Sequence, residues 1–362
     1  MAKIKNIELK NFRNFKNFKN SFDNNINILF GNNGSGKTNI LEGISLIAKG
    51  RGIRNSTIYN LINKGEDNFL IKNNLEIQKN IFEIEIFTEQ KNDKFKKIIK
   101  INDDHSKDSQ DFINKSLSYL IFLPEMERLF QASPSYRRNF LDRLIFSSRN
   151  DYNRLINKYK KCLLERNKIL QVNNVDNNWL SHIEKELSSL GLEIYMLRNS
   201  QLKLINNELN ILNNEHKFQF NIELRMKDNF FNESTNFEKY LLTLKDSRTY
   251  DKQSGGAKIG PHRSDIVSII NKDFEASMLS TGQQKTVVLM ILLAQCNYLV
   301  TIKKIDPIFL FDEIGSHLDS NNRHVLLDII NRFDTQFFLT GTDKNLFSFI
   351  STNVAFYNIS NL

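Results

Sequence analysis

The chain has 362 residues, of which 40% are hydrophobic and 25% are charged. These proportions are ordinary for a globular protein and exclude a disordered or collagen-like chain. The net charge of +9 suits a polyanion such as nucleic acid, although an AT-rich genome could impose the same lysine excess. No apolar run approaches the roughly 20 residues of a membrane span, so we expect a cytoplasmic protein without a membrane partner. Cys162 and Cys296 lack CxxC spacing, which predicts inert thiols.

The first chemical motif follows a predicted strand. Short strands are expected within residues 3–30, and a helical apolar pattern covers residues 39–48. Between them, the sequence matches the phosphate-binding pattern G-x-x-x-x-G-K-[ST] with Gly31, Asn32, Asn33, Gly34, Ser35, Gly36, Lys37 and Thr38. In such a P-loop the backbone N–H groups converge on phosphates, the lysine reaches the β- and γ-phosphates, and the hydroxyl ligates Mg²⁺. We therefore predict ATP and Mg²⁺ as cofactors.

A β-hairpin is predicted next. Alternating apolar residues at 75–87 and 95–101 flank a polar segment at residues 89–93. Its lysines, together with two arginines after the P-loop helix, could contact DNA phosphates with salt sensitivity and little sequence preference. These residues are Lys94, Lys96, Lys97, Lys100, Arg51 and Arg54. For the hairpin, a solvated charged face is the alternative.

A helical region is predicted over residues 135–214, with the polar segment 173–178 separating two antiparallel helices. Arg137 and Arg138 begin this region, where a cation opposes the helix dipole, so either a carboxylate or DNA should compensate them. We expect an α/β fold whose P-loop core, with a β-hairpin lobe, comprises residues 1–134 and 215–362. Residues 135–214 would be an inserted helical lobe.

A second phosphate site is predicted at Leu279-Ser280-Thr281-Gly282-Gln283-Gln284-Lys285. A Ser-X-Gly turn that opens a helix presents N–H groups, a hydroxyl and the positive end of the helix dipole to an anion. One nucleotide rarely needs both this site and a P-loop of the same molecule. We therefore expect Ser280, Gly282 and Gln283 to contact ATP held by another copy, in an ATP-dependent homodimer.

An apolar strand at residues 308–311 ends in two carboxylates, the Walker B arrangement. Asp312 is predicted to hold Mg²⁺, and Glu313 is the general-base candidate; with Lys37 it forms the predicted catalytic pair. The segment Ser316-His317-Leu318-Asp319 fits a loop that crosses the dimer interface, where Asp319 would sense the partner's nucleotide. Many ATPases with a P-loop and such a signature turn carry a histidine that senses the γ-phosphate after the next strand. At that place this chain has only Thr340 and Thr342. Slow hydrolysis is therefore expected.

The six histidines form no HxH or HExxH pattern, so we expect no other catalytic metal.

With the P-loop, LSTGQQK, FLFDE and SHLD in this order, the chain resembles the ABC-type ATPases of chromosome maintenance, and within them the RecF family. Further similar segments are Asn-Phe-Arg-Asn at 11–14, Phe-Leu-Pro-Glu at 122–125, the serine-proline and paired arginines before Phe-Leu-Asp within 133–142, and Gly-Pro-His-Arg at 260–263. The resemblance spans nearly the whole chain. The chain departs from the family pattern at Glu313, His317 and Ser264, where the family usually has acidic residues, aspartate at the first and third.

The resemblance implies an ABC-type core and a weak ATPase that dimerises on ATP and releases its dimer on hydrolysis. It implies binding to single-stranded or gapped duplex DNA, with recognition of single-strand gaps or junctions. It also implies action with RecO and RecR to load RecA, in DNA repair, replication and SOS induction. A structural chromosome-organising ATPase is the alternative, but the helical region at residues 135–214 is too short to form the long coiled coil of such proteins. A transporter ATPase places its signature closer to the P-loop, and a nuclease would need additional clustered carboxylates. The roles of His262 and Arg263, after a Gly-Pro turn, stay open between structure and phosphate sensing.

Overall fold

The structure is a computed structural model that describes residues 2–47, 52–91, 94–216, 220–315, 320–351 and 353–359. The chain forms two compact units. Unit 1 comprises Met1–Glu127 and Thr281–Leu362, and unit 2 comprises Arg128–Ser280. Unit 1 is thus assembled from both ends of the chain.

A five-stranded parallel sheet lies at the centre of unit 1, in the order β14-β4-β13-β12-β8. The strands are β4 (Ile26–Phe30), β8 (Tyr119–Phe122), β12 (Ile308–Phe311), β13 (Phe337–Gly341) and β14 (Val354–Asn358). Every residue of β12 and β13 is buried, as continuous apolar runs in a covered parallel sheet require. The carboxyl ends of β4, β12 and β13 meet at one edge, which is where ligands bind such sheets.

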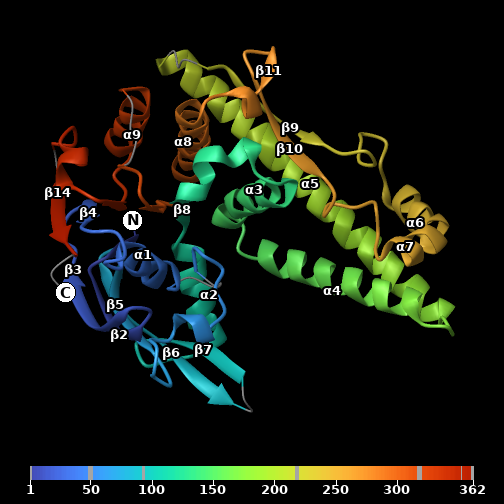
Figure 1. Ribbon diagram of the computed structural model, residues 1–362, viewed down its shortest axis with the longest axis horizontal. Coiled ribbons are helices and arrows are strands. Elements are labelled where there is room, and N and C mark those ends of the chain that lie inside the picture. The colour runs from blue at the N-terminus through green and yellow to red at the C-terminus, as the bar shows by residue number, and fades with distance from the viewer. Residues whose placement is uncertain are drawn as a thin grey trace. The chain divides into compact units, whose positions relative to one another are not determined.

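Helices cover both faces of this sheet. In Figure 1, α1 (Lys37–Ser45) lies on one side, and α8 (Thr281–Tyr298) and α9 (Ser320–Arg332) lie on the other. Together with η4 (Leu299–Lys303), α8 is long and apolar enough to cross a membrane, so the expectation that no apolar run reaches such a length was wrong. Because 78% of its apolar window is buried within the protein, this segment is a core helix.

An antiparallel sheet completes unit 1, in the order β3-β2-β5-β6-β7, with β1 paired to β5. Its strands are β1 (Ala2–Ile4), β2 (Asn6–Phe12), β3 (Phe15–Ser21), β5 (Leu70–Ile77), β6 (Asn80–Lys91) and β7 (Lys94–Ile101). The predicted hairpin is present as β6 and β7. The sequence prediction had run residues 75–87 as one segment, but the chain turns at Gln78 and Lys79, whose φ angles are +50° and +71°. Three short elements, η1 (Tyr59–Leu61), α2 (Lys107–Ser116) and η5 (Lys344–Phe347), also belong to this unit.

Unit 2 is mainly helical. Following η2 (Pro124–Gln131), which leads into it from unit 1, it contains α3 (Pro134–Ser148), α4 (Tyr152–Gln171), α5 (Asn177–His216), α6 (Phe237–Asp246) and α7 (Arg248–Ser254). The break between α4 and α5 falls at the predicted polar segment, and the two helices run side by side (Figure 1). A short antiparallel sheet joins β9 (Ile222–Lys227), β10 (Asp265–Ile270) and β11 (Phe274–Glu275), followed by η3 (Ala276–Met278).

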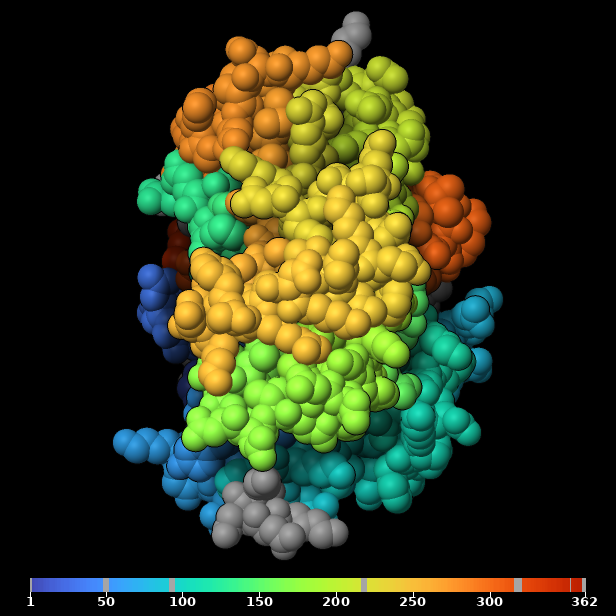
Figure 2. Space-filling view, turned by 90° about the vertical axis from the view of Figure 1, so that its right-hand side faces the viewer, coloured from blue at the N-terminus to red at the C-terminus, as the bar shows by residue number. Residues whose placement is uncertain are grey.

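The units divide the chain differently from the predicted domains. Residues 128–134 and 215–280, assigned to the ATPase core from the sequence, belong to unit 2. The reason is packing, because β9 contacts α5 and β10 contacts α3. In Figure 2, α6 and α7 lie beside α4 on one outer face of this unit.

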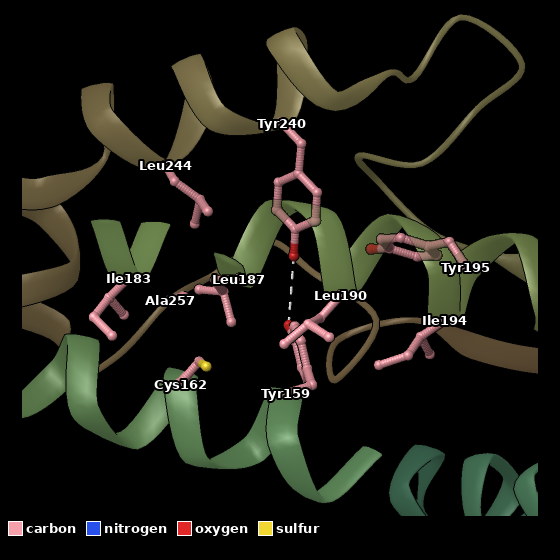
Figure 3. Packing of buried hydrophobic residues seen from close by; sticks show 10 residues of the cluster. All are labelled: Tyr159, Cys162, Ile183, Leu187, Leu190, Ile194, Tyr195, Tyr240, Leu244 and Ala257. Atoms are coloured by element: carbon pink, nitrogen blue, oxygen red, sulfur yellow. Dashed lines mark hydrogen bonds between the residues drawn. The ribbon is translucent and has the colours of Figure 1, made fainter. Parts of the chain in front are cut away.

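The core of unit 2 is a cluster contributed mainly by α4, α5 and α6. Figure 3 shows Tyr159 of α4 and Tyr240 of α6 pointing toward each other across the apolar side chains, and their hydroxyl oxygens are 3.4 Å apart. A buried ion network lies nearby, in which Arg166 donates to Glu184 at 3.1 Å and to Asp251 at 2.8 Å. It fastens α4 to α5 and α7. Cys162 belongs to the apolar cluster, and both cysteines are buried and free.

Candidate nucleotide-binding site

The P-loop lies between β4 and α1, and its shape depends on glycine. Gly36 has a φ angle of +105°, and a Cβ atom there would approach Cζ of Phe15 to 2.4 Å. Only glycine tolerates both this backbone conformation and this contact. The neighbouring Asn14 donates to the carbonyl of Ser35 at 3.2 Å, so the turn between β2 and β3 braces the loop. The Asn-Phe-Arg-Asn segment is thereby placed against the predicted phosphate site.

Lys37 is the first residue of α1 and is 5% exposed. Its Nζ atom donates to the carbonyl oxygens of Gly31 and Asn32, each at 2.8 Å. Burial lowers the pKa of Lys37, and the negative charges of Glu313 and Asp312 act in the opposite direction. The ammonium group is thus held within the loop and within electrostatic reach of the Walker B carboxylates, as a phosphate-binding lysine requires.

Thr38 and Asp312 meet at the carboxyl edge of the sheet. Oγ1 of Thr38 lies 2.9 Å from Oδ1 and 2.8 Å from Oδ2 of Asp312. Burial raises the pKa of Asp312, while hydrogen bonds from Thr340 and Thr38 oppose that shift. A hydroxyl and a carboxylate are hard oxygen ligands, and Mg²⁺ is typically bound by one or two carboxylates plus substrate phosphates. The pair therefore fits Mg²⁺, and the described residues contain no cluster of three or more His, Cys, Asp or Glu side chains that could hold another metal.

Thr340 lies below this site, at the end of β13, and is fully buried. Its hydroxyl donates to Oδ1 of Asp312 at 2.7 Å and accepts the backbone N–H of Glu313 at 2.7 Å. A hydroxyl has one proton, so this geometry leaves none for a phosphate. The sequence prediction placed Thr340 against the nucleotide; the structure instead places it behind the Walker B residues. Thr342 is exposed.

Glu313 follows β12 with a φ angle of +50°, which is uncommon for a residue other than glycine. The hydrogen bond from its N–H to Thr340 holds this backbone conformation. Non-glycine residues with such angles cost about 1–3 kcal/mol and persist where surrounding contacts over-determine them. The predicted general base thus sits on a constrained turn at the edge where Lys37 and Asp312 lie.

The predicted signature turn opens a helix, as expected. Ser280 is exposed and immediately precedes α8, whose first turn contains Gly282 and Gln283. The carbonyl of Gly282 accepts from Oγ1 of Thr286 at 3.1 Å. Asp319, Ser316, His317 and Leu318 lie outside the described residues.

Lys285, the last residue of the signature segment, was not singled out from the sequence. It is 1% exposed, and its Nζ lies 2.8 Å from Oε1 of Glu127 and 3.3 Å from the carbonyl of Ile314. Ile314 directly follows Glu313, so Lys285 connects the signature helix to the Walker B turn. A lysine at the start of an otherwise apolar helix was the available signal.

A second buried ion pair fastens α1. Arg13 donates to both carboxylate oxygens of Glu42, at 2.7 and 2.8 Å, and Glu42 has no exposed surface. Bidentate geometry of this kind is the strong form of the arginine–carboxylate pair. Arg54 donates to Asn39 at 2.9 Å and lies 3.8 Å from Glu42, while Arg51 lies outside the described residues. Arg54 is therefore already engaged with α1.

The hairpin lysines differ in their surroundings. Lys97 donates to the carbonyl of Leu46 at 3.1 Å, and burial lowers its pKa to about 8. It therefore points toward the end of α1. Lys96 and Lys100 lie directly opposite Glu89 and Glu85 on β6, and nothing is described of the Lys94 side chain. Opposite charges in cross-strand positions favour the solvated charged face that the sequence had left as the alternative.

The chain matches known proteins over nearly its whole length. Residues 3–361 match the family described as "RecF/RecN/SMC N terminal domain". The DNA replication and repair protein RecF of Rickettsia conorii is 34% identical over 346 residues, covering 94% of each chain, and that of Rickettsia prowazekii matches equally.

Solved structures agree with these matches. A structure of the recombination mediator protein "RecF-ATPrS in RecFOR pathway" superposes with a TM-score of 0.84 and 26% identity, covering 99% of this chain and 96% of that one. The corresponding RecF-ATP structure gives a TM-score of 0.82 and 27% identity, covering 97% and 94%. An Smc head bound to the C-winged helix domain of ScpA gives 0.54 at 17% identity, covering 95% and 90%, which shows a shared fold only.

Proposed function

The chain belongs to the RecF family of DNA replication and repair proteins, within the RecF/RecN/SMC ATPases, and we propose that it binds ATP with Mg²⁺ and thereby dimerises on DNA. It is a recombination mediator of the RecF type. The observation that carries the nucleotide proposal is the contact between Thr38 and Asp312, 2.8 Å apart although 274 residues separate them in sequence.

Each residue of the site has a proposed role. Backbone N–H groups of residues 31–38 bind the phosphates, and Lys37 contacts the β- and γ-phosphates. Thr38 and Asp312 hold Mg²⁺, which when bound would neutralise charge that develops on the phosphates. Glu313 orients the attacking water and accepts its proton, and Thr340 holds Glu313 and Asp312 in register. Hydrolysis then releases the dimer.

The partner copy completes the proposed site. Ser280, Gly282 and Gln283 lie at the amino end of α8, where the backbone N–H groups and helix dipole favour an anion. We assign them, with Asp319, to the ATP bound by the other subunit. This assignment explains why one chain carries two phosphate motifs.

The proposed partners follow from the family. The solved relatives are described as recombination mediators in the RecFOR pathway. We propose accordingly that this chain acts in the cytoplasm at single-stranded gaps or gapped duplex DNA, and that RecO and RecR join it to load RecA. DNA repair, replication and SOS induction would depend on this step.

Sedimentation with and without ATP–Mg²⁺, repeated with gapped duplex DNA at two salt concentrations, tests the proposal. We expect an ATP-dependent dimer that binds DNA more weakly at high salt. Lys37→Met should abolish nucleotide binding and dimerisation, whereas Lys64→Met, at an exposed lysine of the same unit, should leave both intact. A wild-type monomer indifferent to ATP and DNA would overturn the proposed function, and unchanged ATP binding in Lys37→Met would overturn the P-loop assignment.

A further inference from the structure

Unit 2 contains a concentration of arginines around the start of α3 and the loop of residues 257–264. The two aspartates at this place are already paired. Asp142 accepts from Arg198 at 2.9 and 2.8 Å, and Asp265 accepts from Arg137 at 2.8 and 2.7 Å. Both pairs are bidentate, so each carboxylate is committed to one guanidinium.

Two further arginines have no such partner. Arg138 donates to the carbonyl of Ser264 at 2.6 Å, and Arg263 donates to the carbonyl of Ala257 at 3.1 Å. Within the described residues neither guanidinium forms an ion pair. A carbonyl satisfies one of the five N–H groups of a guanidinium and neutralises no charge. Among the four arginines and two aspartates, two arginines are thus left without an ion-pair partner in the described part of the chain.

The charge of Arg138 is affected by the neighbouring arginines and aspartates. Its side chain is partly buried, and that burial, followed by the positive charge of Arg198, lowers the pKa of Arg138; the charges of Asp265 and Asp142 act in the opposite direction, and Arg263 adds to the lowering. His262, in the same neighbourhood, adds no compensating negative charge. Like charges that are held close together favour an anion between or above them.

The loop that carries Arg263 is rigidly anchored. Gly260 has a φ angle of +125°, and a Cβ atom there would approach the hydroxyls of Tyr159 and Tyr240 to 2.4 and 2.5 Å. His262 bonds the same Tyr159 hydroxyl through Nδ1 at 2.7 Å and the carbonyl of Ala257 through Nε2 at 3.0 Å. Figure 3 shows Tyr159, Tyr240 and the loop's own Ala257 as members of the buried cluster. The exposed Arg263 is thus fixed on a preorganised backbone, which reduces the entropy lost on binding.

We propose that Arg138 and Arg263 form a binding site for phosphate groups of the DNA backbone. The inference rests on the proposed DNA-binding function and deepens it by naming contact residues. Guanidinium groups match phosphate geometry and bind it without reading base sequence, as a protein that recognises DNA structure requires. On the hairpin, by contrast, Lys96 and Lys100 lie directly opposite Glu89 and Glu85 in the strand pairing.

The test is DNA binding by the full chain. The affinity for a fluorescent gapped duplex is measured by anisotropy over a series of salt concentrations, with ATP–Mg²⁺ present. We expect Arg263→Gln to weaken binding by about tenfold at low salt and to reduce the slope of log K against log salt by about one. Arg225→Gln is the matched control, since Arg225 is equally exposed in unit 2 but is paired with Glu223 at 2.7 Å. It should leave the slope unchanged.

A second variant removes the other arginine charge. Arg138 donates to the carbonyl of Ser264, and Arg138→Gln should weaken DNA binding while ATP binding is unchanged. If Arg138→Gln fails to fold, Arg263→Gln decides alone, because the exposed Arg263 side chain can be replaced without disturbing the core.

The outcomes separate the inference from the function on which it rests. If wild-type protein binds DNA and Arg263→Gln binds with the same affinity and slope, the site is wrong and the proposed function stands. Equal losses in Arg263→Gln and Arg225→Gln would also overturn the site, because only general charge would matter. If wild-type protein with ATP binds no DNA, both fail.

Discussion

The hydroxyl of Thr340 donates to Asp312 and accepts the backbone N–H of Glu313, each across 2.7 Å. One buried hydroxyl thereby fixes both the predicted metal ligand and the predicted general base. Because Thr340 lies at the end of β13, the strand next to β12, it holds in place the two residues that follow β12.

Removing this hydroxyl should affect turnover more than binding. We expect Thr340→Val to lower kcat on the order of 10- to 100-fold, because small misplacements of catalytic groups carry penalties of this size. The KM for ATP should stay close to wild type, since the P-loop is untouched. Thr340→Ser restores the hydroxyl and should recover most of the rate in a steady-state phosphate-release assay. If KM rises while kcat is unchanged, Thr340 contacts the nucleotide after all.

Glu313→Gln should separate ATP binding from hydrolysis. The amide keeps the size of the side chain but cannot accept the proton of the attacking water, so we expect hydrolysis to fall by about 10²- to 10⁴-fold. The ATP dimer should then persist on DNA, measurable as a slower dissociation rate. Glu313→Asp retains a carboxylate and should keep part of the activity. Wild-type turnover by Glu313→Gln would remove Glu313 as the base.

Ser280→Arg tests the assignment of the signature turn to the partner's nucleotide. A bulky cation at the exposed start of α8 should block dimerisation while leaving ATP binding by the monomer intact. Light scattering with ATP–Mg²⁺ reports the first property, and fluorescence of a labelled ATP analogue reports the second. Ser254→Arg, at an exposed serine elsewhere in unit 2, is the control. Equal loss of both properties would contradict a role across the dimer.

His262 should make stability pH-dependent. Burial, partly opposed by its hydrogen bond to Ala257, lowers the pKa of His262 to about 4, compared with 6.5 for the free side chain. Below pH 6.5 the unfolded chain therefore binds a proton that the folded chain does not. The free energy of unfolding should fall as the pH drops from about 6.5 to about 4, by up to about 3 kcal/mol.

Urea denaturation at a series of pH values measures this effect. His262→Gln cannot titrate and should show a shallower loss of stability over the same interval. Parallel curves for wild type and His262→Gln would show that other groups account for the acid response.

Much of the site could be predicted because its motifs consist of residues that are adjacent in sequence. This holds for the P-loop at Gly31 to Thr38 and for the apolar strand before Asp312. Placing Thr340 beneath Asp312 depends on a hydrogen bond between adjacent strands 28 residues apart, for which no local signal exists.

Other differences have equally physical causes. The turn at Gln78 and Lys79 carries no glycine or asparagine, the residues that usually mark positive φ angles. The grouping of β9 and β10 with unit 2 results from contacts with α5 and α3, and residue composition does not reveal such contacts. The partners of Arg137 and Arg138 likewise became visible only when β10 and the loop before it were placed beside α3.

The pairing of β4 has a consequence for how the protein is made. The two strands that pair with β4 are β13 and β14, at residues 337–341 and 354–358. During synthesis both edges of the strand that precedes the P-loop therefore stay unpaired until residues 337–358 have left the ribosome. Unit 2 is continuous in sequence and has its own core, so it can fold first. Nascent chains interrupted before residue 337 would expose an apolar strand with unpaired edges, which favours aggregation.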